Sequence, residues 1–360
     1  MLNVSILPTE LWHAIFKLAC VDGGFTGRSL ALTSKFFHAQ SLSPRFHSLA
    51  FDSLEKLEGF IAFLYTLTRG FKPRVEHLYL AVLEEPFMVI PTDFWTGTPL
   101  AERLAHGRYT AEREAKWNKR FITVATALFA LTSPDLRTLT IADYSSARMP
   151  SFPCPSFPKL EELCITQQTS TLFGKLPYDR GANPFAKFPV LRRLHYVSHF
   201  PTQIITDLSE YASPPLTHFR LSGVNADIVD EFISALDAPH RDEETALDGE
   251  SHPSPANLTK LKCLVLHAFP DPAPAFYGAN STLHDRPFNR VQHIPQKSDR
   301  SECLRVLVMC RPWRTNAQWP CRLLVDWLRR MEGGEGCWVT SEEVEARLET
   351  YSRDLHCGFL

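Results

Sequence analysis

The sequence predicts an α/β protein with an amino-terminal helical unit, an irregular solenoid of short parallel strands, and a carboxyl-terminal helical cap. Three observations predict this arrangement: helical periodicity in the first fifty residues, a recurrent L-x-x-L-x-L spacing after Pro73, and a second helical periodicity from Cys321 onward. Apolar residues make up 44% of the 360 positions and charged residues 22%, which is ordinary for a globular protein. This composition excludes a wholly disordered or collagen-like chain.

Residues 1–50 form a distinct unit with two helical patterns. Leu11, Ile15 and Leu18 recur at the spacing of one helix face, and Asp22-Gly23-Gly24 breaks that pattern. A second pattern runs from Ser29 to Phe37. A unit of this size buries too little surface to be stable alone. Its aromatic residues are therefore expected to pack either on the rest of the chain or on a partner: Trp12, Phe16, Phe36 and Phe37.

This unit resembles an F-box, in the variant abundant in mushroom-type fungi. The likeness rests on Leu7-Pro8-Thr9-Glu10-Leu11, Ile15-Phe16 and the run from Ser29 to Phe37, and it covers roughly residues 5 to 50. The glycine-rich connection at Gly23-Gly24 departs from the more compact and apolar link of the common F-box. The resemblance implies binding to a Skp-type adaptor and, through it, to a cullin scaffold. The residues that match the motif, and are therefore expected at the adaptor, are Leu7, Pro8, Leu11, Ile15, Leu30, Leu32 and Phe36.

Residues 51–72 are expected to form a connecting helix, and residues 73–330 a domain that resembles a degenerate leucine-rich repeat. Pro134, Pro158 and Pro189 each stand two residues before the first leucine of a triplet, which marks the end of a crossover and the start of a strand. Triplets that begin at 136, 160, 191 and 216 lie 24, 31 and 25 residues apart, near the period of leucine-rich repeats. An irregular α/β domain with half-buried strands is the alternative. The triplets are Val75-Leu78-Leu80, Leu136-Leu139-Ile141, Leu160-Leu163-Ile165, Leu191-Leu194-Tyr196, Leu216-Phe219-Leu221, Leu261-Leu264-Leu266 and Leu304-Leu307-Met309.

The later crossovers contain insertions, and the segment 238–257 is expected to be disordered because it offers almost nothing to bury. In a solenoid the triplet residues point into the core, while the residues between them line a concave face. This face is expected to bind an unknown target protein. The residues expected there are His77, Tyr79, Glu162, Arg193, His195, His218, Arg220 and His267.

Two further helices are expected. A crossover helix around Trp117 to Leu131 would pack between the first and second triplets. A helix over Cys321–Met331, together with a second helix that starts near Thr340, would make residues 331–360 a cap for the end of the solenoid. A partner-binding tail is the alternative for the second of these helices.

Charge and targeting signals narrow the partners. Thirty-eight basic against forty acidic residues give a net charge of −2, so we expect neither nucleic acid nor a membrane surface as a partner. The amino terminus lacks the pattern of a signal peptide, and no apolar run reaches the length of a membrane span. Nine dispersed cysteines without a C-x-x-C pair predict free thiols in a reducing compartment, cytoplasm or nucleus.

Catalytic and cofactor motifs are missing from the sequence, which lacks a G-x-S-x-G elbow, a phosphate-binding loop and an H-E-x-x-H pair. Cys164 and His195 could be a nucleophile and its base, but the sequence does not fix their separation. The histidines show no metal-ligand spacing. We therefore expect no catalytic residue, no metal and no cofactor.

The sequence thus leads to one favoured function and two alternatives. By its resemblance the chain would be the non-catalytic substrate-recognition subunit of a Skp-cullin-F-box ubiquitin ligase, which raises the effective concentration of a target near the ubiquitin-loaded enzyme. A protein-interaction scaffold of the same architecture without ubiquitin machinery is the first alternative. An enzyme of unfamiliar motif is the second.

Overall fold

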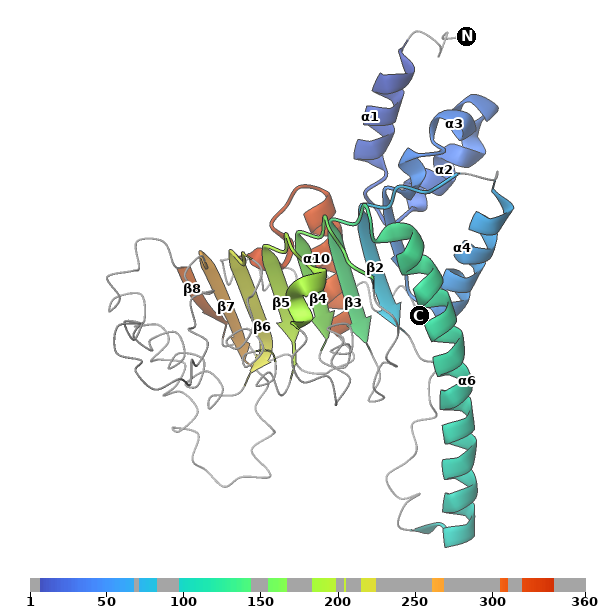
Figure 1. Ribbon diagram of the computed structural model, residues 1–360, viewed down its shortest axis with the longest axis vertical. Coiled ribbons are helices and arrows are strands. Elements are labelled where there is room, and N and C mark those ends of the chain that lie inside the picture. The colour runs from blue at the N-terminus through green and yellow to red at the C-terminus, as the bar shows by residue number, and fades with distance from the viewer. Residues whose placement is uncertain are drawn as a thin grey trace.

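The computed structural model shows an α/β fold in which one parallel sheet carries a helical unit at one corner and helices on both faces (Figure 1). It describes residues 7–67, 71–82, 97–143, 155–166, 183–198, 204, 215–224, 261–268, 305–309 and 319–339. The α/β class and the parallel sheet that the sequence predicts are confirmed.

Eight strands pair side by side in the order in which the chain makes them, and every pair is parallel. The second and third members of each predicted triplet lie within a strand, while the first member comes just before it. The strands are β1 (Ser48–Phe51), β2 (His77–Val82), β3 (Thr138–Asp143), β4 (Glu162–Thr166), β5 (Arg193–Val197), β6 (His218–Val224), β7 (Cys263–Ala268) and β8 (Arg305–Met309).

The two faces of the sheet follow the period of two that extended chain imposes. In β2, Leu78 and Leu80 belong to the main hydrophobic core, whereas Tyr79 and Ala81 lie in a second cluster on the opposite face. The main core continues through the triplet residues of β3 to β7 and includes helices α4 (Leu54–Thr66) and α6 (Leu100–Thr132). Phe157 and Phe188, which precede two of the marker prolines, stack in this core with ring centroids 5.6 Å apart.

The opposite face is covered by the carboxyl-terminal segment. Helix α10 (Trp319–Met331) and the short helix η10 (Gly336–Trp338) place Leu323 and Trp327 against Tyr79, Cys164 and Val197. The Tyr79 hydroxyl donates a hydrogen bond of 2.7 Å to the Pro320 carbonyl. In Figure 1, α10 lies behind the strands β2 to β5.

The sequence-based interpretation is wrong in two respects. The sheet is a single open layer and not a solenoid. A solenoid repeats units of similar size, whereas the helices that connect these strands differ in length, with 13 residues in α4 and 33 in α6. The segment expected to cap the end of the domain instead covers a face, because the apolar side of α10 finds its partners on β2 to β5. The expected insertion 238–257 and the expected helix from Thr340 onward lie outside the described residues.

The amino-terminal unit consists of α1 (Thr9–Ala19), α2 (Phe25–Thr33), α3 (Lys35–Gln40) and the short helix η2 (Pro44–Phe46), and it leads directly into β1. It stands at the amino edge of the sheet beside β1 and β2 (Figure 1). Strand β1 was not predicted from the sequence. Helix α4 lies within the range 51–72 that was expected to form a connecting helix.

Candidate functional site

The amino-terminal unit has an aromatic core of its own. Trp12 and Phe16 of α1 meet Phe36 and Phe37 of α3, with ring centroids 5.4 to 5.9 Å apart and mostly edge-to-face geometry. The four aromatic residues thus pack on one another within the unit, which was neither of the two expected arrangements. This packing fixes α1 against α3 and decides which side of α1 faces outward.

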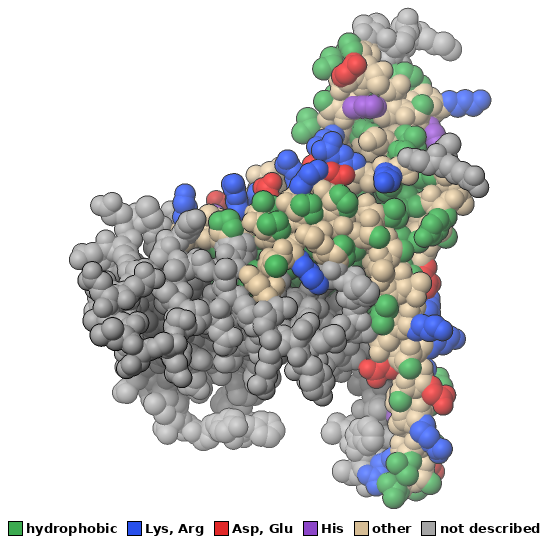
Figure 2. All heavy atoms as spheres, in the orientation of Figure 1, with side chains coloured by type: hydrophobic (Ala, Val, Ile, Leu, Met, Phe, Trp, Pro, Cys, Tyr) green, Lys and Arg blue, Asp and Glu red, His purple; other side chains and the backbone are tan. Residues whose placement is uncertain are grey.

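The outward side of α1 is apolar. Leu7, Leu11 and Ile15 are 39%, 50% and 45% exposed, and Leu18 is 78% exposed. Leu11, Ile15 and Leu18 share one face of the helix, and Leu7 precedes the helix at the same spacing; these four residues are called here the α1 stripe. On α2, Phe25 and Leu32 are also exposed, at 76% and 79%. Figure 2 shows hydrophobic side chains at the surface of this unit.

Most of the residues expected at the adaptor are therefore accessible. Pro8 is exposed, as are Leu7, Leu11, Ile15 and Leu32, whereas Leu30 and Phe36 are half-buried. Sequence reasoning did not include Leu18 and Phe25. For Leu18, its position one turn after Ile15 was the available signal.

Polar contacts tie this unit to the sheet. The Ser48 hydroxyl donates to the Cys20 carbonyl at 2.8 Å and accepts from the Gly23 amide at 3.1 Å, and the Ala50 amide donates to the Gly23 carbonyl at 3.1 Å. Gly23 has φ of +76°, and a Cβ there would lie 2.7 Å from the Cβ of Ala50. The glycine-rich connection therefore allows the loop to lie directly on β1.

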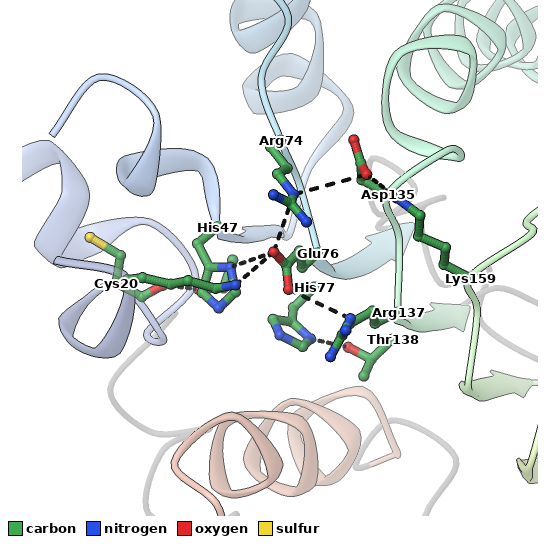
Figure 3. A network of polar contacts seen from close by, with 11 residues as sticks. Cys20, His47, Arg74, Glu76, His77, Asp135, Arg137, Thr138 and Lys159 are labelled. Carbon is green, nitrogen blue, oxygen red and sulfur yellow. Dashed lines mark hydrogen bonds and ion pairs between the residues drawn. The ribbon is translucent and has the colours of Figure 1, made fainter. Parts of the chain in front are cut away.

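A buried carboxylate stands at the centre of this junction. Glu76, just before β2, accepts a 2.7 Å hydrogen bond from Lys17 of α1, and Arg74 and Arg137 lie 3.4 and 3.7 Å away (Figure 3). Burial opposes the charge on Glu76, but Lys17, His47 and Arg74 together hold the pKa of its carboxyl below the ordinary value. The ionised carboxylate thus links α1 to the amino edge of the sheet.

Two histidines flank Glu76. The rings of His47 and His77 meet edge to face with centroids 4.8 Å apart, and His77 Nδ1 lies 3.0 Å from the Thr138 hydroxyl. Burial is the main cause that lowers the pKa of His47, and burial together with the nearby His47 lowers that of His77 to about 3. Both imidazoles are therefore neutral at physiological pH.

Within the described part of the chain, His47, Glu76 and His77 could hold a metal ion, because one ligand atom from each lies within 4.8 Å of the others. Neutral imidazoles and a carboxylate are suitable ligands for zinc. The surroundings do not suit a divalent cation, since Lys17, Arg74 and Arg137 already supply positive charge to the only carboxylate in the group. This arrangement fits a structural junction better than a metal centre.

The eight residues expected to bind a target divide into two sets. Tyr79, His195, Arg220 and His267 are buried on the face that the carboxyl-terminal segment covers, so no other protein can reach them in this arrangement. His77, Glu162, Arg193 and His218 stand at the amino ends of their strands and line one surface hollow of about 380 Å³. Sequence reasoning missed the cations beside them, and the available signal was the position directly before each strand: Arg137, Arg192 and Lys262.

His195 and Arg220 of the buried set belong to a hydrogen-bonded chain that also includes Cys164 and Ser222. Cys164 Sγ lies 3.3 Å from His195 Nδ1, His195 Nε2 lies 3.0 Å from the Ser222 hydroxyl, and Arg220 donates at 2.6 Å to the Cys337 carbonyl. Burial raises the pKa of the Cys164 thiol well above its usual value and lowers that of His195 well below. The pair is thus a protonated thiol beside a neutral imidazole, covered by α10. It stabilises the carboxyl-terminal segment and lacks the thiolate that nucleophilic catalysis requires.

Comparisons with protein-family models, with curated proteins and with solved structures found no match for this chain. Among the helices in the described part of the chain, none combines the length and the apolar character needed to cross a bilayer.

Proposed function

We propose that this chain is a non-catalytic recognition subunit of a Skp-cullin-F-box ubiquitin ligase, in which the amino-terminal unit binds a Skp-type adaptor. The sheet domain would then present a target protein to the ubiquitin-loaded enzyme, and its contribution would be effective concentration. The observation that carries the proposal is the α1 stripe, an exposed apolar helix face on the unit whose sequence resembles an F-box.

The energetics are adequate for a specific interface. Full burial of one leucine or isoleucine side chain contributes roughly 1.5 to 3 kcal/mol, and the stripe offers four such side chains. The stripe side chains are 39% to 78% exposed, so their burial on binding contributes about half of the sum for four full burials. With Leu32 and Phe25 on α2, which are 79% and 76% exposed, the total exceeds the lower estimates of the entropy lost on association. The polar ties to Ser48 and Glu76 hold the unit on the sheet, so a bound adaptor would have a defined orientation relative to the target.

The test is binding of the full chain to a purified Skp-type adaptor, measured by isothermal titration calorimetry. The double substitution Leu11→Ser with Ile15→Ser removes two stripe side chains, and we expect adaptor binding at least about a hundredfold weaker. Leu100→Ser with Leu104→Ser is the matched control, because these leucines of α6 have the same spacing and are 62% and 58% exposed.

The control variant should bind the adaptor as tightly as the unsubstituted chain. Equal binding by the Leu11/Ile15 variant would contradict the proposed interface. If the unsubstituted chain does not bind the adaptor at all, a scaffold without ubiquitin machinery becomes the better interpretation.

A further inference from the structure

The hollow of about 380 Å³ at the amino edge of the sheet lies beside the carboxyl-terminal end of α10. Its lining is rich in cations from the amino ends of three strands and from the helix: Arg137, Arg192, Arg193, Lys262 and Arg330. Two acidic residues, Glu161 and Glu162, also line it. Lys and Arg side chains follow this edge of the molecule in Figure 2. The local charge is thus positive on a chain whose net charge is −2.

The backbone holds these side chains in a regular row. The residue that directly precedes each strand from β1 to β6 accepts two amide hydrogen bonds with its carbonyl oxygen. The donors are the residue directly before the next strand and the first residue of that strand. For example, the Glu161 carbonyl accepts from the amides of Arg192 and Arg193 at 2.9 and 3.0 Å. By the same pattern the Glu161 amide donates to the Arg137 carbonyl, the Thr217 amide to the Arg192 carbonyl and the Lys262 amide to the Thr217 carbonyl. The row therefore runs in the order Arg137, Glu161, Arg192, Thr217 and Lys262. Neighbours in the row are about 5 Å apart, the spacing of paired strands. Arg137, Arg192 and Lys262 therefore follow one another at roughly 10 Å intervals.

One of the two acidic residues that line the hollow, Glu162, is already neutralised. Glu162 is only 12% exposed and accepts hydrogen bonds from Arg330 at 2.9 Å and from the Trp338 indole at 3.0 Å, with Arg193 at 3.4 Å. By contrast, Arg192 and Lys262 are exposed and form no ion pair with any acidic residue in the described part of the chain. Both cations are thus available to pair with a carboxylate of another molecule.

We propose that this hollow binds an acidic peptide segment of the target protein, with carboxylates placed at about every third residue. As a statement about a target, this rests on the function proposed above. In a polyproline II helix three residues make one turn and rise about 9 Å, so carboxylates at this spacing share one face of the peptide and can reach Arg137, Arg192 and Lys262 in turn. Arginine and lysine bind carboxylates by charge-assisted hydrogen bonds, which gives the contact both affinity and direction.

The exposed Glu161 argues for a peptide and against nucleic acid. It stands in the row between Arg137 and Arg192, where it would repel a uniformly charged strand. A strand of duplex DNA carries a phosphate about every 3.4 Å and could not avoid this carboxylate. A peptide with neutral residues between its acidic ones can place a neutral residue beside Glu161 and so avoid this repulsion.

The test uses the full chain and a fluorescein-labelled peptide in which three glutamates are each separated by a threonine and a proline, read by fluorescence anisotropy. We expect saturable binding that weakens with added salt. The same peptide with glutamine for each glutamate should not bind. Arg192→Gln with Lys262→Gln should weaken binding about tenfold, as expected for two exposed charge contacts. The matched control, Lys116→Gln with Lys119→Gln on α6, removes two exposed cations outside the hollow and should bind normally.

Three results would overturn the proposal: no binding of the glutamate peptide by the unsubstituted chain, unchanged binding by the Arg192/Lys262 variant, or tighter binding of a single-stranded oligonucleotide. A peptide with its three glutamates adjacent should bind more weakly, and equal binding would refute the spacing. Adaptor affinity of the Arg192/Lys262 variant should stay normal. Failure of the peptide assay is therefore distinguishable from failure of the adaptor assay.

Discussion

The ammonium nitrogen of Lys17 lies 2.7 Å from the carboxylate of Glu76, so helix α1 is joined by an ion pair to the residue that precedes β2. The two partners differ in exposure: the Lys17 side chain is 47% exposed and that of Glu76 only 5%. The carboxylate of Glu76 also forms ion pairs with Arg74 and Arg137, so Glu76 contributes more to the stability of the junction than Lys17 does.

Replacement of the two partners should therefore have unequal effects. Glu76→Gln removes the buried charge that three cations share, and we expect the free energy of unfolding to fall by about 1 to 3 kcal/mol. Lys17→Met keeps the aliphatic stem and leaves Glu76 with its arginines, so the loss should stay below about 1 kcal/mol. Urea unfolding of both variants measures the difference. Equal losses would contradict this account of the junction.

Gly27 of α2 tests how closely the amino-terminal unit is packed. A Cβ at this position would lie 2.7 Å from the Arg45 carbonyl oxygen, and backbone cannot move aside as a flexible side chain does. Gly27→Ala should destabilise the protein by roughly 1 to 3 kcal/mol. Gly59→Ala is the control, because the open space around this glycine of α4 should let alanine stabilise the helix by up to about 1 kcal/mol. Thermal unfolding should thus shift in opposite directions for the two variants.

Acid should weaken the junction through His77. The pKa of this histidine is about 3 in the folded protein because of burial and the nearby His47, against about 6.5 in an unfolded chain. Between these values the unfolded state binds more protons, so stability falls as the pH drops from about 6.5 toward 3. His77→Asn retains a polar atom near Thr138 without the titration.

The measurement is the free energy of unfolding at pH 7 and at pH 5. The unsubstituted protein should lose about 1 to 2 kcal/mol more than the His77→Asn variant over this interval. Identical losses in the two proteins would show that His77 does not contribute to the pH dependence.

Tyr79 connects the sheet to the carboxyl-terminal segment. Tyr79→Phe leaves the ring but removes the hydroxyl that binds the Pro320 carbonyl, which should cost about 1 kcal/mol and loosen α10. Faster proteolytic cleavage within residues 319–339 is the expected readout. Tyr65→Phe is the matched control, since Tyr65 is 78% exposed on α4, and its cleavage rate should stay unchanged.

Local sequence patterns predicted the strands well. The triplets identified β2 to β8 because a strand buried on one face requires apolar residues at alternate positions, and the prolines marked where strands begin. Strand β1 was missed although Phe46-Leu49-Phe51 has the triplet spacing and Pro44 stands two residues before it, because this run was assigned to the unit that resembles an F-box. The exposed side of α1 was likewise predictable from its helical spacing, together with the resemblance to an F-box.

The arrangement of the two sheet faces was not predictable in the same way. Alternation assigns His195 and Arg220 to one face, but it does not reveal that a segment more than a hundred residues later covers that face. The hydrogen bond of Arg220 to Cys337 and that of Tyr79 to Pro320 are long-range contacts, which no local window contains. The row of cations needed the strand register, which only the paired sheet provides.

The strands lie in the sheet in the same order as along the chain, and this order affects how the protein can fold during synthesis. On a ribosome, each newly emerged strand can join the one before it without waiting for distant sequence. The contact between Tyr79 and Pro320, 241 residues apart, is an exception, because it can form only after Pro320 has been synthesised. Until then the polar chain from Cys164 to Arg220 is open to water, so the docking of α10 is a late step of biogenesis, and chaperones could bind the uncovered face.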